Sequence, residues 1–132
     1  MNLYGIFVAI TTPMNRDETL NPDYYRYKID FLQSKGVNGL FALGTNGEVH
    51  ALEWDEKIRL LETLRSLTGT GLTLCANIGS ATTKHSVELA REAQSIGVDC
   101  LSIITPYFVD VTEEQLYRHF STVAEAVEIP SI

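Results

Sequence analysis

The chain repeats one pattern along its whole length: a short apolar strand followed by an amphipathic helix, with a spacing of about thirty residues, the size of one βα unit with its loops. Strands are predicted at residues 5–11, 39–44, 72–77 and 100–105, and a fifth begins at Pro130. Strands that are apolar on both faces are typical of a parallel sheet covered by helices. Four consecutive units of this kind suit either a doubly wound sheet or a (β/α)8 barrel, and the spacing leaves both open.

The helices between these strands have clear start and stop signals. They are predicted at residues 22–35, 53–68, 84–96 and 112–128. Asn21 suits an N-cap before Pro22, and Thr112 with Gln115 forms the pattern of a capping box. We expect two sets of apolar side chains on these helices to pack in the core: Tyr24, Tyr25 and Tyr27 in the first helix, and Leu116, Phe120, Val123, Ala124 and Val127 in the last.

Composition narrows the class of protein. A chain of 132 residues that is 45% apolar fits one domain with one core. The net charge of −7 and the scattered basic residues argue against a sequence-independent grip on nucleic acid or on an anionic membrane. The first fifteen residues lack the basic start and long apolar core of a signal peptide, and no apolar stretch reaches the roughly 20 residues of a membrane helix. We therefore expect a cytosolic protein.

The residues that commonly bind metals or cofactors give little signal here. Cys75 and Cys100 both lie in apolar segments, which favours buried, reduced thiols over a disulfide or a ligand pair. His50, His85 and His119 do not have the spacing of metal ligands. No G-x-G-x-x-G follows a predicted strand, so dinucleotide binding lacks its main support. The sequence predicts neither a metal nor a cofactor.

One turn carries most of the candidate chemistry. Residues 44–48 read Gly-Thr-Asn-Gly-Glu directly after the second predicted strand. Gly44 and Gly47 permit backbone angles that other residues avoid, so the turn can direct consecutive N–H groups and the side chains of Thr45 and Asn46 to one spot, as a small anion requires. The alternative is an ordinary strand-to-helix connection whose polar residues satisfy only their own backbone. In either fold this turn and residues 105–108 lie on the rim where the strands end.

Four segments together carry a resemblance to a known family. They are VAITTPM at 8–14, GTNGE at 44–48, GSATTKHSVELAREAQSIGVDCL at 79–101 and TPYF at 105–108. In this order and spacing they resemble the amino-terminal half of the dihydrodipicolinate synthase/N-acetylneuraminate lyase family, the pyruvate-dependent Schiff-base aldolases. The resemblance implies a (β/α)8 TIM barrel, of which residues 1–132 supply about the first four βα units as the amino-terminal half of a single domain.

The resemblance also assigns roles to the turn and the rim. It implies that Gly44 to Gly47 hold the carboxylate of pyruvate or another 2-oxo acid through backbone N–H groups, the hydroxyl of Thr45 and the amide of Asn46. Glu48 is expected to accept N–H bonds near the start of the following helix, a structural role. The family forms homo-oligomers, so a dimer or tetramer is expected, with Tyr107 and Phe108 at the site rim or a subunit contact. It uses no cofactor and no metal.

The catalytic residues of the family are expected beyond Ile132: a lysine that forms an imine with the keto carbon and a tyrosine that carries protons. Lys28, Lys35, Lys57 and Lys84 all lie in or at the edges of predicted helices, where a solvated amine is a poor nucleophile. We therefore expect this chain alone to be inactive and the intact protein to be a carbon–carbon or carbon–oxygen lyase, a class I aldolase. If 132 residues is the natural length, the alternative is a non-catalytic, self-associating half-barrel.

Two positions bear on the substrate. In the synthases of the family a proton relay uses a threonine and a tyrosine at the positions of Asn46 and Phe108, neither of which has a hydroxyl here. This favours retro-aldol cleavage of a 2-oxo-3-deoxy or 2-oxo-4-hydroxy acid to pyruvate and an aldehyde. The alternative is 4-hydroxy-tetrahydrodipicolinate synthase activity, the condensation of pyruvate with aspartate semialdehyde.

Overall fold

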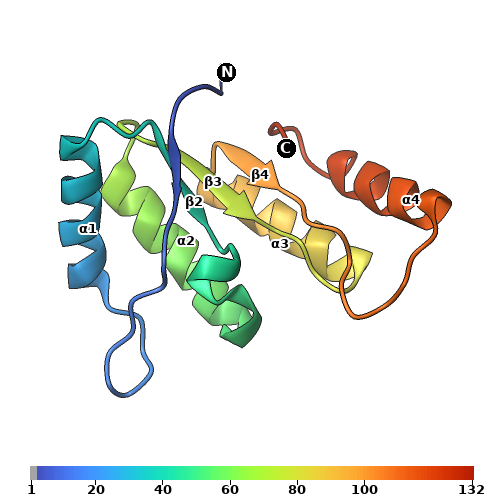
Figure 1. Cartoon of the computed structure of the whole chain (residues 1–132), viewed down its shortest axis with the longest axis horizontal. Coiled ribbons are helices and arrows are strands. Elements are labelled where there is room, and N and C mark those ends of the chain that lie inside the picture. The colour runs from blue at the N-terminus through green and yellow to red at the C-terminus, as the bar shows by residue number, and fades with distance from the viewer. Residues whose placement is uncertain (1–2) are drawn as a thin grey trace.

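The computed structural model describes residues 3–132 and contains four strands that alternate with four α-helices (Figure 1). The elements are β1 (Phe7–Ala9), α1 (Pro22–Ser34), β2 (Gly39–Ala42), α2 (Trp54–Thr68), β3 (Thr73–Asn77), α3 (Thr83–Ile96), β4 (Cys100–Ser102) and α4 (Glu113–Ala124). The strands pair in parallel in the order β1-β2-β3-β4. The predicted βα repeat is confirmed, although each strand is shorter than its apolar segment.

A fifth strand begins where the sequence predicts it. Ser131 forms a parallel bridge with Leu101 of β4, and the N–H of Ile132 donates to the carbonyl of Leu101 over 2.9 Å. The sheet therefore grows in one direction, with each new strand on the outside of the one before. This is the order of strands in a barrel, whereas a doubly wound sheet reverses direction partway through.

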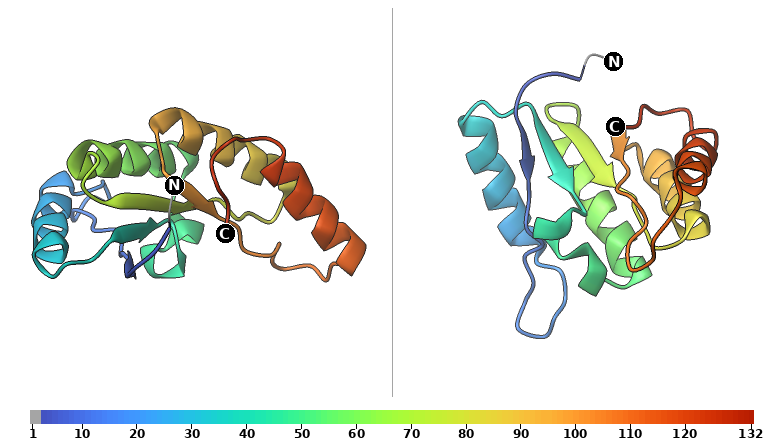
Figure 2. Two further views of the ribbon diagram at one scale, coloured as in Figure 1. Left: turned by 90° about the horizontal axis from the view of Figure 1, so that it is seen from above. Right: turned by 45° about the vertical axis from the view of Figure 1, so that its right-hand side comes forward.

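The helices follow an arc on one side of the sheet, from α1 at one end to α4 at the other (Figure 2). Residues that are paired in register across the strands share a face, and Leu40 and Leu74 lie fully buried on the face that meets the helices. The opposite face carries Phe7, Phe41 and Cys75, and no α-helix of residues 3–132 covers it (Figure 2). In a closed barrel this second face would be the interior.

The helix starts agree with the signals in the sequence, but α4 ends at Ala124 and not at the predicted residue 128, which leaves Val127 outside the helix. The side chain of Asn21 accepts from the N–H of Tyr24 over 3.0 Å, and Thr112 and Gln115 form both bonds of the capping box. A second capping box, between Glu53 and Glu56, starts α2 and was not predicted. Each cap satisfies backbone N–H groups that the first turn of a helix leaves without an acceptor.

The predicted core is correct in part. Tyr25 is buried, but Tyr24 and Tyr27 are 48% and 67% exposed, so the prediction that all three tyrosines pack in the core is wrong. One narrow stripe of α1 faces the sheet, and Tyr25 and Ile29, four residues apart, occupy it. In α4, Val123 is buried and Ala124 is exposed. The remaining members of the α4 set, Leu116, Phe120 and Val127, are half-buried.

The two cysteines are free and fully buried, as the sequence predicts. Cys75 of β3 and Cys100 of β4 are partners in register on adjacent strands. Burial raises the pKa of both thiols, and the neighbouring Cys100 adds to the rise at Cys75. Thiols of this kind remain protonated and unreactive near neutral pH.

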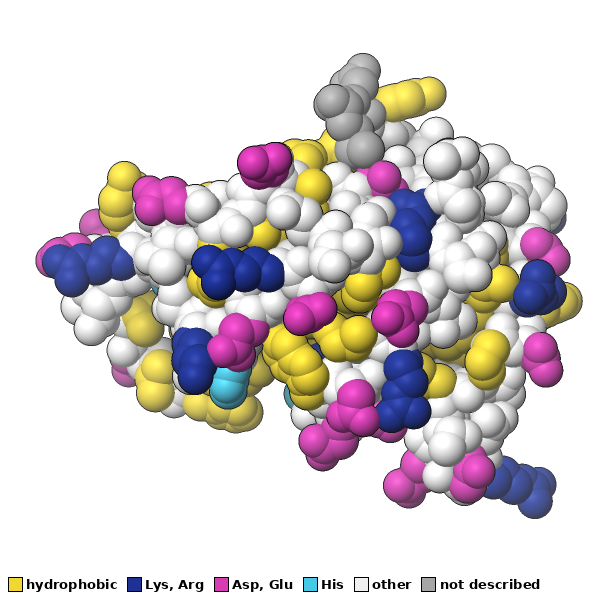
Figure 3. Space-filling view, turned by 180° about the vertical axis from the view of Figure 1, so that it is seen from behind, with side chains coloured by type: hydrophobic (Ala, Val, Ile, Leu, Met, Phe, Trp, Pro, Cys, Tyr) yellow, Lys and Arg dark blue, Asp and Glu magenta, His cyan; other side chains and the backbone are white. Residues whose placement is uncertain are grey.

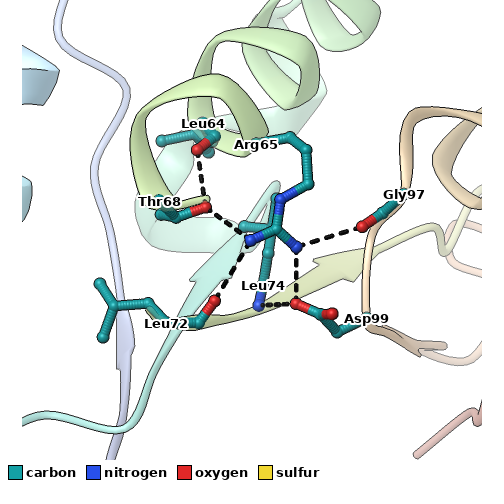
Figure 4. Close-up of polar contacts among 7 residues, drawn as sticks. All are labelled: Leu64, Arg65, Thr68, Leu72, Leu74, Gly97 and Asp99. Carbon is teal, nitrogen blue, oxygen red and sulfur yellow. Dashed lines mark hydrogen bonds and ion pairs between the residues drawn. The ribbon is translucent and has the colours of Figure 1, made fainter. Parts of the chain in front are cut away.

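A cluster of polar contacts ties α2, β3 and β4 together at the amino-terminal end of the strands (Figure 4). Arg65 of α2 donates to Asp99 over 2.7 Å, to the carbonyl of Gly97 over 3.1 Å and to the hydroxyl of Thr68 over 2.9 Å. Asp99 in turn accepts from the N–H of Leu74 over 2.7 Å. The two charged side chains are 18% and 24% exposed, so this pair is largely shielded from water.

Charges on the helix-covered face of the molecule are mixed in sign. Lys and Arg side chains alternate there with Asp and Glu, and apolar side chains lie between them (Figure 3). The described residues form no continuous basic surface, which binding to nucleic acid requires, on this face. In the described residues no helix is long and apolar enough to cross a membrane.

Candidate functional site

The candidate site lies at the carboxyl-terminal edge of the sheet. Because the strands are parallel, the segments that follow β2 and β4 leave the sheet on the same side (Figure 1). These segments are the turn at 44–48 and residues 105–108, which the sequence places on one rim. Ligand sites in parallel α/β folds are found at this edge, because the loops there vary without disturbing the sheet.

The backbone of the turn differs from the sequence prediction. Gly44 has φ −78° and ψ −178°, an extended conformation that any residue can adopt, and the φ of Gly47 is not positive. The residues on either side, Leu43 and Glu48, are left-handed, with φ of 57° and 53°. The prediction that the glycines supply unusual backbone angles is therefore wrong.

The two glycines are needed instead for close approach. A Cβ atom on Gly44 would lie 2.7 Å from the ring of Phe41. On Gly47 a Cβ would lie 3.2 Å from the carbonyl oxygen of Ile10 and 3.3 Å from the hydroxyl of Thr12. The turn is thus pressed against β2 on one side and against the segment after β1 on the other.

Thr45 to Gly47 form a single 3-10 turn. The N–H of Gly47 donates to the carbonyl of Gly44, and the N–H of Glu48 donates to that of Thr45, both over 3.0 Å. The first amides of a 3-10 turn, here those of Thr45 and Asn46, have no acceptor inside the turn. The side chains of Thr45 and Asn46 are exposed, so hydroxyl, amide and backbone donors are together within two adjacent residues.

Two polar side chains from the neighbouring strands hold this turn. The hydroxyl of Thr12, after β1, donates to the carbonyl of Gly47 over 2.6 Å. The side-chain amide of Asn77, at the end of β3, donates to the carbonyl of Leu43 over 2.9 Å. Neither contact was predicted from the sequence. The available signal was Asn77 itself, a polar residue at the end of an otherwise apolar strand.

Glu48 does not act as expected. Its carboxylate is exposed and accepts none of the hydrogen bonds recorded among residues 3–132. A second 3-10 turn, Val49–Ala51, separates Glu48 from α2, whose first N–H groups are capped by Glu53 and Glu56. Glu48 therefore shapes the turn through its left-handed backbone, and the prediction that its carboxylate accepts N–H bonds is wrong.

Tyr107 and Phe108 differ in their surroundings. Their rings meet edge to face with centroids 5.1 Å apart. Phe108 is 95% exposed and left-handed, with φ 71°. Tyr107 lines a cavity of about 380 Å³ together with Trp54, Lys57 and Gly79. Val49, which directly follows the 44–48 turn, also lines this cavity, whereas Thr45 and Asn46 do not.

All four lysines lie in or at the end of helices, as predicted, but two are less solvated than expected. Burial lowers the pKa of Lys28 and Lys57; for Lys57, Glu53 and Glu56 oppose this effect. The amine of Lys28 donates to the hydroxyl of Thr11, which follows β1, over 2.5 Å. Neither amine is supplied by the carboxyl end of a strand.

None of the three histidines lies within the 44–48 turn. His50 and His85 are exposed, and His119 is buried in α4 with its Nδ1 atom 2.9 Å from the hydroxyl of Thr83. Burial lowers the pKa of His119. No group of three or more His, Cys, Asp or Glu side chains in the described part of the chain could hold a metal ion.

Comparisons with known proteins agree with this geometry. Curated relatives include an uncharacterised DapA-like lyase of Pyrococcus furiosus, 38% identical over 128 residues, and a 4-hydroxy-tetrahydrodipicolinate synthase of Methanosphaera stadtmanae, 35% identical over 132 residues. The matches cover 97% and 100% of this chain but 43% and 44% of the relatives. The chain thus spans less than half the length of these relatives.

Solved structures give the same result. YagE of Escherichia coli, a prophage protein of the dihydrodipicolinic acid synthase family determined with pyruvate, matches with a TM-score of 0.93 at 30% identity over 96% of this chain and 43% of its own. The N-acetylneuraminate lyase of Mycoplasma synoviae matches with a TM-score of 0.89 at 27% identity, over 97% and 45%. The strands and helices therefore form the first four βα units of a TIM barrel. The sequence model described as the dihydrodipicolinate synthetase family matches residues 2–132, and the chain belongs to that family.

Proposed function

We propose that this chain is the amino-terminal half of the barrel of a Schiff-base-forming, pyruvate-dependent aldolase. In this proposal the intact protein carries residues 1–132 together with the units that follow β4 in its relatives, and it works in the cytosol as a homo-oligomer. Its reaction is the retro-aldol cleavage of a 2-oxo-3-deoxy or 2-oxo-4-hydroxy acid to pyruvate and an aldehyde. The observation that carries the proposal is the 44–48 turn, at the ligand-binding edge of a chain that belongs to this family.

The chemistry of the turn suits a carboxylate. The Thr45 hydroxyl, the Asn46 amide and the first two N–H groups of the turn are donors, and hydrogen bonds to an ionised acceptor are the strong ones. Gly44 and Gly47 let the turn pack close to its neighbours, which fixes the donors before the substrate arrives. The pyruvate in the YagE structure is an example of such a ligand in a similar protein.

The covalent step requires residues outside this chain. A lysine amine attacks the keto carbon, water leaves, and the resulting imine withdraws electrons from the bond to be cleaved. We place this lysine, and the tyrosine that carries its protons, beyond Ile132. Lys28 and Lys57 have lowered pKa values through burial, but both lie on helices that cover the outer side of the sheet. This chain alone is therefore expected to be inactive.

Trapping of the imine tests the proposal. Borohydride added with pyruvate should reduce the imine and attach the substrate irreversibly to one lysine of the intact protein, which the intact mass and a peptide map would show. Residues 1–132 alone should gain no mass. A protein that is not modified, or one modified at Lys28 or Lys57, would contradict the proposal.

The choice of substrate rests on Asn46 and Phe108. An amide cannot pass a proton onward as a hydroxyl does, and phenylalanine cannot take part at all, so a relay through these positions is broken. We expect aspartate semialdehyde condensation to be slower than cleavage of the best 2-oxo-3-deoxy acid by a factor of about 10² or more, the usual effect of one acid–base group. The measurement is kcat/KM for both reactions, with Phe108→Tyr alongside. A faster condensation that Phe108→Tyr does not improve would establish the synthase reaction instead.

The exposed ring of Phe108 supports a subunit contact. A fully exposed aromatic residue in a left-handed conformation gains little in an isolated chain, and Tyr107 packs against it edge to face. We propose that these two residues meet another subunit of the dimer or tetramer. Phe108→Ser should shift the intact protein towards smaller species in sedimentation, and an unchanged oligomer would place the contact elsewhere.

The alternative is a half-barrel that associates with itself and has no catalytic role. The helix-free face of the sheet and the apolar hollow formed by Ile103, Phe120 and Ile132 favour it, because both need a cover. Sedimentation of residues 1–132 tests this alternative. A soluble monomer at micromolar concentration excludes it, whereas a defined dimer supports it only if pyruvate and borohydride label no longer form of the protein.

A further inference from the structure

Asn77 is a buried polar residue at the carboxyl end of β3. It is 2% exposed, and its register with Ser102 of β4 places it on the helix-free face of the sheet. Both ends of its side chain are used. The Nδ2 group donates to the carbonyl of Leu43 over 2.9 Å, and Oδ1 accepts from the N–H of Gly79 over 3.2 Å. Burying an amide costs free energy unless its groups are paired, and this amide is paired to two different loops.

The bond to Leu43 fixes a strained peptide. Leu43 is 1% exposed and has φ 57°, a conformation that costs a residue with a side chain roughly 1–2 kcal/mol. Such a conformation persists only where surrounding contacts hold it. The carbonyl that Asn77 holds belongs to the peptide linking Leu43 to Gly44, and the Thr45–Gly47 turn starts at the next residue. The direction in which this turn leaves the sheet therefore depends on Asn77.

The other end of the turn is held from the opposite side. The hydroxyl of Thr12 donates to the carbonyl of Gly47 over 2.6 Å, and Gly47 packs too closely on Ile10 and Thr12 to accept a side chain without a shift. The turn is thus fixed at its start by a residue of β3 and at its end by a residue that follows β1. Thr45 and Asn46 lie between these two attachments.

We propose that Asn77 is a positioning residue for the carboxylate of the substrate. It does not touch the substrate; it holds Leu43, and so places the donors of Thr45 and Asn46 where the carboxylate binds. The inference rests on the proposed function, because it assigns to Asn77 the geometry of that carboxylate site. It predicts that loss of Asn77 weakens binding of the oxo acid as well as lowering stability.

A matched control lies at the other end of the sheet. The side chain of Asn38 also joins neighbouring strands, since its Oδ1 accepts from the N–H of Ile6 over 2.9 Å at the amino-terminal end of β1 and β2. Asn38→Leu removes a half-buried amide far from the turn. If Asn77 acted through stability alone, Asn77→Leu and Asn38→Leu would have the same effect on KM.

The test measures pyruvate KM and the rate of borohydride trapping in the intact protein. Asn77→Leu should raise KM on the order of 10- to 100-fold, the cost of a misplaced binding group, whereas Asn38→Leu should leave KM within about twofold. Asn77→Asp keeps an acceptor for Gly79 but can donate to Leu43 only while its carboxyl group is protonated, so its KM should rise as the pH is raised and the group ionises. It remains informative if Asn77→Leu does not fold.

A double-mutant cycle separates positioning from other effects. If Asn77 acts by placing Thr45, the Asn77→Leu/Thr45→Val variant should lose little more affinity than the worse single variant, because a misplaced hydroxyl contributes nothing. Asn38→Leu and Thr45→Val should combine additively. Additive losses for Asn77 and Thr45, or an ordinary KM in both Asn77 variants, would overturn the inference while trapping of the wild type still upheld the proposed function. A wild type that pyruvate and borohydride do not label would overturn both.

Discussion

The two ends of the sheet differ in which residue types have a positive φ. Each strand is preceded by a glycine with positive φ: Gly5, Gly36, Gly69 and Gly97. The residues with positive φ that are not glycine lie in the segments after the strands: Glu18 after β1, Leu43 and Glu48 after β2, and Phe108 after β4. Glycine adopts this conformation without the cost that a Cβ atom adds. In residues 3–132 the amino-terminal end is therefore relaxed and the carboxyl-terminal end is strained.

The polar contacts follow the same division. At the amino-terminal end, Arg65 and Asp99 bond to each other and to the backbone groups of Leu72, Leu74 and Gly97 (Figure 4). At the carboxyl-terminal end, Thr12 and Asn77 each hold one carbonyl of the 44–48 turn, and the donors of Thr45 and Asn46 are left exposed. One end is built for stability, whereas the other keeps strain and free donors where a ligand can use them. Changes at the first should alter stability alone, and changes at the second should alter binding.

The largest expected effect is on stability, from Arg65→Ala. This change leaves Asp99 shielded without its cation and removes a donor from Gly97 and Leu72, so the free energy of unfolding should fall by about 3 kcal/mol. Urea unfolding of the intact protein measures it. Arg59→Ala on the same helix is the control, because its partner Asp55 is exposed and such pairs contribute about 0.5 kcal/mol or less. A rise in the pyruvate KM of Arg65→Ala would contradict the division between the two ends.

Thr45→Val should have the opposite signature. It removes a donor to the bound carboxylate and should weaken oxo-acid binding by about 1–3 kcal/mol. The side chain is exposed, so the urea midpoint should not change. Titration with pyruvate measures the change in affinity, and urea unfolding of the same sample measures the change in stability. An unchanged KM and kcat would show that the turn is structural only.

A matched pair of substitutions measures the strain directly. Gly97 and Glu48 are both left-handed, with φ 90° and ψ 31° against φ 53° and ψ 37°, at opposite ends of the sheet. A Cβ on Gly97 would meet only the Cδ of Arg65, at 3.7 Å, so Gly97→Ala should cost about 1 kcal/mol through backbone conformation. Glu48→Gly should stabilise the protein by a similar amount, and any loss of pyruvate affinity would show that the turn uses the restriction. Changes of the same sign at both positions would remove the basis of the comparison.

The sequence predicts the repeating elements well because their signals are local. Parallel pairing and the caps at Asn21 and Thr112 follow from apolar spacing and short-range chemistry, whereas the order of the strands does not, because the spacing suits a doubly wound sheet as well as a barrel. The exposure of Tyr24 and Tyr27 was missed because several aromatic residues in one helix give no clear choice of buried stripe. The turn was located correctly, but its backbone was not. Glycine is needed at positions 44 and 47 because of close contacts with Phe41, Ile10 and Thr12. Only the folded chain brings these segments together.

The smallest predicted effect concerns pH and the contact of His119 with Thr83. Thr83 begins α3 on the side of the strained loops, and burial lowers the pKa of His119 in the folded protein. The unfolded chain, with a histidine pKa near 6.5, therefore binds the proton more readily than the folded one. Stability should be constant above about pH 6.5 and should fall as the pH drops towards the lowered pKa, by about 1.4 kcal/mol for each unit of difference.

His119→Gln should remove this part of the slope between pH 7 and 5, whereas His85→Gln should keep it because His119 is intact. Acid should therefore loosen the α3–α4 contact, and hydrogen exchange at pH 5.5 and 7.5 would show whether protection is lost around Thr83.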